Sequence, residues 1–239
     1  MTVVLFPTCL VELVRPGVAT AAARVLARGG EPVEIAKAAT CCGQPAWNSG
    51  FAPEARRVAR HTLRVLDGTD GPIVLPSGSC TAMIQHYWPA LFAGTEDEAA
   101  AARVAGRVHE FSAFQAENGE AAPAVAAATR TVAFHDSCHM LRILRLRDEP
   151  RRLLAGAGID VAEQPAAAGQ RCCGFGGTFS MKLPEISTAM ADEKLDDIVA
   201  TGASNVVGCD LSCLAHLDGR ARRRGLPLRF RHLAEALDQ

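Results

Sequence analysis

Nine cysteines constrain this sequence more than any other feature, because eight of them form two matched sets. The first set is Cys9, Cys41, Cys42 and Cys80, and the second is Cys138, Cys172, Cys173 and Cys213. The members of the second set follow their counterparts by 129, 131, 131 and 133 residues. Such constant offsets indicate a tandem duplication of one cysteine-bearing unit. The ninth cysteine, Cys209, has Pro76 as its counterpart, so the halves hold four and five cysteines.

The residues around the cysteines repeat in the same register. In each half an apolar run precedes the first cysteine, a Cys-Cys-Gly triplet follows about thirty residues later, and a second apolar run precedes the last cysteine or cysteines. An Ala-rich stretch with Gly119 and Pro123 separates the halves and has the composition of a linker. We therefore expect a first domain at 1–118, a linker at 119–130 and a second domain at 131–239.

Short apolar runs alternate with helical stretches in both halves, which is typical of a parallel α/β layer. The expected strands lie near 2–6, 32–36, 72–75 and 107–109, and near 131–134, 159–163, 205–207 and 227–230. The expected helices include 16–28, one that begins at Pro53, 184–202 and 231–237. The sequence thus predicts an α/β protein of two tandem Rossmann-like units with short parallel sheets. Loops at the carboxyl ends of parallel strands meet at one edge, where distant cysteines can converge.

Composition excludes several classes of function. The chain has 239 residues, of which 49% are hydrophobic and 21% charged, and its formal net charge is −1. This charge provides no general attraction for nucleic acid or an anionic membrane. No apolar run approaches the roughly 18 residues needed to span a bilayer, and the first residues lack the features of a signal peptide. We expect a cytoplasmic protein without a membrane span and without a nucleic-acid partner.

The cysteine spacing leaves three interpretations open. A single free cysteine is usually a small buried apolar residue, but packing does not explain a duplicated pattern with two adjacent pairs. Several thiolates suit zinc, copper(I) or iron–sulfur clusters. Structural zinc sites use close cysteine pairs, whereas adjacent cysteines can reach two irons, and the glycines at 174–177 allow N–H donation to sulfur. Iron–sulfur binding is favoured over a zinc module or a metal-free thiol redox protein.

Five motifs make the sequence recognisable. They are FPTC at 6–9, CCGQPAWNSG at 41–50, PSGSC at 76–80, HDSCH at 135–139 and CCGFGGTFSMKLPEIS at 172–187. Over essentially its whole length the chain resembles the CCG (cysteine-rich) domain family, found in heterodisulfide reductases and in iron–sulfur subunits of glycolate oxidase and anaerobic glycerol-3-phosphate dehydrogenase. The likeness is greatest to the lactate-utilization members of that family.

This resemblance implies an iron–sulfur oxidoreductase subunit of an L-lactate-oxidising system that yields pyruvate, with a cluster of the 4Fe–4S type. The implied partners are a ferredoxin-type iron–sulfur subunit and a third small subunit. The family's fullest form ends in C-x2-C, whereas this chain has a lone Cys80 in one half and Cys209-x3-Cys213 in the other. The second half is therefore the first place to look for a cluster. The expected metal ligands are Cys9, Cys41, Cys42, Cys80, Cys138, Cys172, Cys173, Cys209 and Cys213.

Polar residues around Cys138 allow further interpretations. His135 and His139 flank this cysteine, and either could be a metal ligand, a proton donor or a histidine bonded to local backbone. We expect Asp136 to cap the following helix. We expect the basic run at 142–152 to form a solvated helix face.

Overall fold

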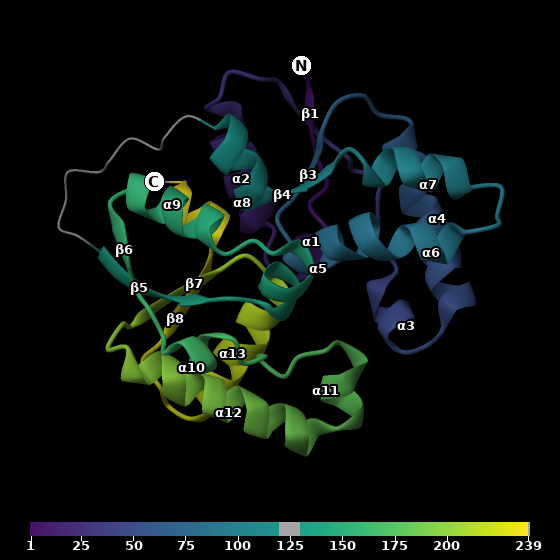
Figure 1. Ribbon diagram of the computed structural model, residues 1–239. Coiled ribbons are helices and arrows are strands. Elements are labelled where there is room, and N and C mark those ends of the chain that lie inside the picture. The colour runs from purple at the N-terminus through teal and green to yellow at the C-terminus, as the bar shows by residue number, and fades with distance from the viewer. Residues whose placement is uncertain (120–129, 239) are drawn as a thin grey trace. The chain divides into compact units, whose positions relative to one another are not determined.

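The computed structural model describes residues 1–119 and 130–238 (Figure 1). The chain divides into two compact units, Met1–Gly119 and Glu120–Gln239. Most of the expected linker at 119–130 lies outside the described residues. Among the described residues, no helix combines the length and the apolar character required to cross a bilayer.

The first unit contains a sheet of four parallel strands in the order β2-β1-β3-β4. Its central strands β1 and β3 are wholly apolar and buried, as expected for strands covered on both faces. Its strands and helices are β1 (Val3–Leu5), α1 (Cys9–Val14), α2 (Gly17–Ala27), β2 (Val33–Ile35), α3 (Gln44–Asn48), α4 (Ala52–Asp67), β3 (Ile73–Leu75), α5 (Gly78–Ala82), the π-helical turn η1 (Met83–Tyr87), α6 (Trp88–Phe92), α7 (Glu98–Ala105), β4 (Val108–Glu110) and α8 (Phe111–Asn118).

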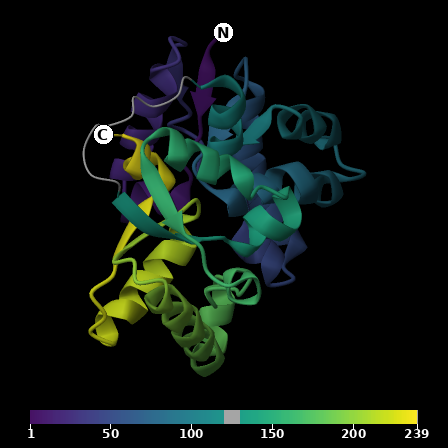
Figure 2. The ribbon, with the colours of Figure 1, turned by 60° about the vertical axis from the view of Figure 1, so that its left-hand side comes forward.

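The second unit repeats this topology with the strand order β6-β5-β7-β8, again all parallel. Helices α12 and α13 pack together on one face of its sheet, as the green and yellow ribbons of Figure 2 show. Its elements are β5 (Arg130–His135), the π-helical turn η2 (His139–Leu144), α9 (Asp148–Gly156), β6 (Ile159–Ala162), α10 (Ala166–Gly169), α11 (Thr178–Lys182), α12 (Pro184–Ala200), β7 (Asn205–Gly208), α13 (Leu211–Arg223), β8 (Arg229–His232) and α14 (Leu233–Leu237).

The strand registers confirm the duplication residue by residue. In the first unit Leu5 pairs with Val74, and in the second Phe134 pairs with Val207. These pairs are the ones that the cysteine offsets of 129 and 133 residues predict. The predicted α/β class with two parallel sheets is therefore confirmed, and each predicted strand overlaps an observed one.

Both sheets have their topological switch point between the two central strands. In the first unit the chain moves from β1 to β2 on one side and then crosses to β3 on the other. In the second unit β5, β6 and β7 follow the same path. Loops at the carboxyl ends of the strands part at such a point and leave a crevice where ligands bind. The cysteine-bearing segments of each unit lie at this edge.

Candidate metal centres

In the first unit, three separate segments bring the cysteines to the carboxyl edge of the sheet. Cys9 begins α1 just after β1, Cys41 and Cys42 lie in the loop after β2, and Cys80 lies in α5 after β3. Ser77 caps α5, and its hydroxyl accepts a hydrogen bond from the Cys80 amide at 3.3 Å. Four sulfurs separated by up to 71 residues therefore share one edge.

Hydrogen bonds connect these four thiols in the order 9, 41, 42, 80. The Cys41 side chain is hydrogen-bonded to both Cys9 and Cys42, and Cys42 Sγ lies 3.4 Å from Cys80 Sγ. The Gly43 N–H also donates to Cys41 Sγ at 3.4 Å. All four cysteines are free thiols, and Cys42 and Cys80 are buried. The arrangement is a compact set of four sulfur atoms that can act as metal ligands.

The second unit contains the same arrangement. Cys138 follows β5, Cys172 and Cys173 lie in the loop before α11, and Cys213 lies in α13 after β7. Their thiols are connected in the order 138, 172, 173, 213. The Gly174 N–H donates to Cys172 Sγ at 3.4 Å, as Gly43 does in the first unit.

Each set favours one thiolate. Hydrogen bonds from Cys42 and Cys9 lower the pKa of Cys41 to about 3, and they raise the pKa values of Cys42 and Cys9. In the second unit, hydrogen bonds from Cys138 and Cys173 lower the pKa of Cys172 to about 2. Without metal, the thiolate of Cys41 or of Cys172 accepts hydrogen bonds from the S–H groups of its neighbours. A bound cation replaces those protons, which is why metal binding to cysteines releases protons.

Side chains outside the cysteine motifs hold the first Cys-Cys loop in place. The Thr62 hydroxyl donates to the Cys41 carbonyl at 2.9 Å, and the Trp88 indole N–H donates to the Cys42 carbonyl at 2.9 Å. Both side chains are buried. Sequence reasoning missed these two residues, and no spacing signal marks them, because each belongs to a helix with its own apolar pattern.

The second Cys-Cys loop is held by different residues. The Ser187 hydroxyl donates to the Gly174 carbonyl at 2.8 Å. The buried Lys194 ammonium donates to the carbonyls of Ala168 and Gly169, both at 3.0 Å. Burial lowers the pKa of Lys194 to about 8. No sequence signal marks Lys194 either, because it lies among the acidic residues of α12 and resembles an exposed position.

Thr8 adopts a backbone conformation that is rare for a residue with a side chain. Its φ is 72°, and it is buried directly before Cys9. Such strained residues persist only where the surrounding structure imposes them, and they cluster at functional sites. The conformation of Thr8 turns the chain from β1 into α1 and so sets the position of the Cys9 side chain.

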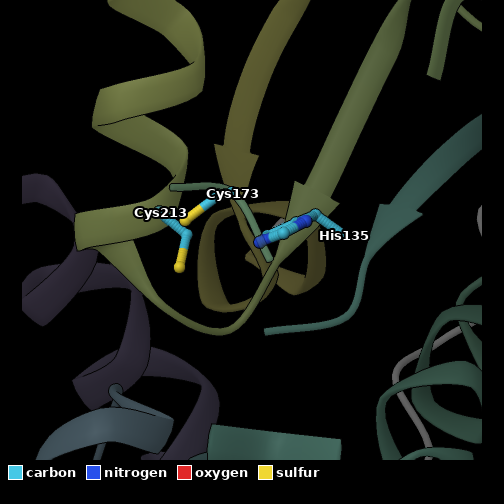
Figure 3. A group of neighbouring side chains, drawn as sticks. All are labelled: His135, Cys173 and Cys213. Carbon is cyan, nitrogen blue, oxygen red and sulfur yellow. The ribbon is translucent and has the colours of Figure 1, made fainter. Parts of the chain in front are cut away.

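One histidine joins the cysteines of the second unit. A ring nitrogen of His135 and the sulfurs of Cys173 and Cys213 all lie within 4.8 Å of one another (Figure 3). Burial and the nearby Lys194 charge lower the pKa of His135 to about 3, so its ring is neutral at physiological pH. Cys209 is buried directly after β7, and its role as a ligand stays a prediction.

Asp136 and Arg151 differ from what the sequence suggested. The expectation that Asp136 caps the following helix is wrong. The N-cap of η2 is Cys138, and the Asp136 carboxylate accepts two hydrogen bonds from Arg151, at 2.9 and 2.8 Å. The Arg151 guanidinium also lies over the Phe134 ring, 5.0 Å from its centroid. Arg151 therefore packs inward from the basic run at 142–152, whereas Arg152 has a side chain 64% exposed, as expected of a solvated face.

Comparisons with known proteins agree with the duplicated arrangement. The sequence profile of the cysteine-rich domain family CCG matches twice, at residues 3–85 and 132–218. The chain is 41% identical to a protein of Anoxybacillus flavithermus named lactate utilization protein A, over all of this chain and 99% of that one. It is 40% identical, with the same coverage, to the protein of that name from Geobacillus kaustophilus. It is also 39% identical to lactate utilization protein A 2 of Bacillus mycoides, again with that coverage.

Proposed function

The chain belongs to the cysteine-rich (CCG) domain family, and on that premise we propose that it is an iron–sulfur subunit of an L-lactate-oxidising system. In this role each unit holds a cysteine-bound cluster of the 4Fe–4S type, which carries electrons from the oxidation of lactate to pyruvate. The observation that carries the proposal is the hydrogen-bonded set of four sulfurs in each unit. The proposed partners are a ferredoxin-type iron–sulfur subunit and a third small subunit.

The donor set fits a cluster better than a single ion. Each unit offers two adjacent cysteines on one loop and two further matched cysteines from other segments, and the second unit also contains Cys209. Adjacent cysteines are poor chelators of one tetrahedral ion but can reach different metal atoms of one cluster. Cysteine thiolates are also the usual ligands of iron–sulfur clusters.

The residues of this chain would then set the properties of the bound cluster. Iron–sulfur clusters supply a site that accepts and gives back one electron at a time. The N–H groups of Gly43 and Gly174 donate to the first sulfur of each pair, and such hydrogen bonds raise the reduction potential by stabilising negative charge. Oxidation of lactate to pyruvate releases two electrons, and two one-electron centres match that number.

A zinc-binding module is the second candidate. The close spacing of His135, Cys173 and Cys213 supports it, because three ligand atoms within 4.8 Å of one another suit a single tetrahedral ion. Zinc has no redox chemistry, so the protein would then serve as a scaffold in the lactate-oxidising system rather than as an electron carrier.

Purification without oxygen distinguishes the two candidates. We expect a brown protein that contains iron and acid-labile sulfide and loses colour when lactate is added together with the partner subunits. Cys172→Ser should lower the iron and sulfide content, whereas Val199→Ala, at an exposed position on α12, should leave both unchanged. A colourless protein with stoichiometric zinc would overturn the iron–sulfur proposal in favour of the zinc module.

A further inference from the structure

His135 is a buried polar residue. It ends strand β5 and has only 1% of its surface exposed. Among the described residues, neither ring nitrogen has a partner. Buried polar groups are nearly always hydrogen-bonded, because leaving them unpaired is unfavourable. A neutral imidazole has one N–H and one nitrogen with a free lone pair. The buried ring of His135 can therefore offer that second nitrogen to a ligand that the protein itself does not supply.

The surroundings of the ring indicate which kind of ligand this is. In Figure 3 the imidazole extends from the end of β5 toward the side chains of Cys173 and Cys213. The potential ligand atoms of these three residues lie within 4.8 Å of one another, and all three residues are buried. Imidazole nitrogen and thiolate sulfur are the donor pair that proteins use for zinc and for iron.

The first unit lacks an equivalent histidine. Because Leu5 corresponds to Phe134 in the strand registers, the next residue, Phe6, corresponds to His135, and Phe6 is also fully buried. The residue paired with His135 is Gly208, whose counterpart in the first unit is Leu75. A Cβ atom at Gly208 would lie 3.1 Å from Leu214 Cδ2 and 3.6 Å from the His135 Cβ. The second unit thus differs from the first in two neighbouring residues, one a potential ligand and the other a glycine beside it.

We propose that His135 supplies a nitrogen ligand to the metal centre of the second unit, beside Cys173 and Cys213, while the first unit binds its centre through cysteines alone. The identity of that centre as an iron–sulfur cluster rests on the proposed function. The two centres are then chemically distinct, because an imidazole ligand is neutral and a thiolate carries a negative charge. Replacing the imidazole by a thiolate should therefore lower the reduction potential of this centre.

Nitrogen hyperfine spectroscopy tests the ligand directly. The anaerobically purified full-length chain carries Cys41→Ser and Cys42→Ser, so that only the second centre is observed, and is prepared with natural or 15N-labelled histidine. In the paramagnetic state, electron–nuclear double resonance should detect a strongly coupled nitrogen that changes isotope with the label. The coupling should disappear in H135F, which introduces the residue of the first unit, and persist in H139Q.

Two further measurements distinguish failure of the His135 proposal from failure of the proposed function. H135C should retain the cluster and lower its midpoint potential, because it exchanges a neutral ligand for an anionic one. The proposal would be overturned if the cluster of the parent sample shows no strongly coupled histidine nitrogen, or if the coupling survives in H135F.

If the protein contains zinc instead of iron and sulfide, the proposed function fails. Zinc X-ray absorption of the same variants then still decides whether His135 is a ligand, by counting the nitrogen neighbours of the zinc. If H135F loses all metal, the labelled parent and labelled H139Q decide together. A strongly coupled histidine nitrogen in both supports the proposal, and its absence from the parent overturns it.

Discussion

Gly43 and Gly174 occupy equivalent positions after the two cysteine pairs and have the same left-handed backbone, with φ of +88° and +86°. Gly43 lies against α4 and Gly174 against α12, in each unit the second helix after the cysteine pair. A Cβ at Gly43 would meet the Ala55 carbonyl oxygen at 2.7 Å, and one at Gly174 would meet the Ser187 carbonyl oxygen at 2.5 Å. Glycine is therefore required at both positions for two reasons, the left-handed turn and the close approach of the helix.

Gly174→Ala should destabilise the second unit and reduce its metal content. The left-handed conformation and the contact with the Ser187 carbonyl together should cost about 2–4 kcal/mol of unfolding free energy. Urea unfolding of the metal-free protein measures the loss. The control is Gly219→Ala within α13, where nothing lies within 4 Å of the new Cβ. That change should stabilise by up to about 1 kcal/mol, and equal effects of both variants would refute the explanation.

The fold was predictable because its signals are local and repeated. Apolar runs indicate the strands, and the constant offset between the cysteine sets indicates the duplication that the pairs Leu5–Val74 and Phe134–Val207 confirm. Side-chain directions were not predictable in the same way. The sequence places His135 near Cys138, but its approach to Cys213 depends on the pairing of β5 with β7. Lys194 is buried where its ammonium donates to carbonyls of the chain before Cys172, a contact that depends on the tertiary structure.

Lys194 should make the unfolding free energy of the metal-free protein increase with pH in the alkaline range. Burial lowers its pKa from 10.5 to about 8 in the folded state, so between these values the unfolded state binds more protons. Stability contributed by this residue should therefore rise as the pH increases from 8 to 10.5, by roughly 3 kcal/mol in total. Urea unfolding of wild type and Lys194→Met at pH 7.5 and 10 isolates this contribution. Parallel pH dependences in the two proteins would contradict it.

The pair of Asp136 and Arg151 should be important for the stability of the second unit. The two side chains are 7% and 13% exposed and form two hydrogen bonds. Arg151→Met leaves a nearly buried carboxylate unpaired, which should cost about 3 kcal/mol. Adding Asp136→Asn should recover part of that loss. Arg152→Met is the matched control, because this side chain is 64% exposed and its removal should change stability by less than about 0.5 kcal/mol.

Asp210 should contribute to the position of Cys213 through the start of α13. Its carboxylate accepts hydrogen bonds from the Ser212 amide at 3.3 Å and the Ser212 hydroxyl at 2.6 Å. Asp210→Ala should destabilise the metal-free protein by about 1 kcal/mol, the usual cost of losing an N-cap, and weaken metal retention against a chelator. Asp210→Ser should retain most of both properties, because serine also caps helices. Equal losses in the two variants would show that capping is not the cause.

The two matched sulfur sets predict two independent metal centres in one chain. Each set consists of four thiols linked in the same order, and each lies within its own compact unit. Cys41→Ser with Cys42→Ser should therefore remove about half of the iron and sulfide per chain, and Cys172→Ser with Cys173→Ser the other half, because the ligands of one unit do not depend on the other. Both are measured on anaerobically purified protein by metal and sulfide analysis. If the first double variant keeps all of the iron and the second loses all of it, only the second unit binds a cluster. If each double variant alone loses all of the iron, the two centres are not independent.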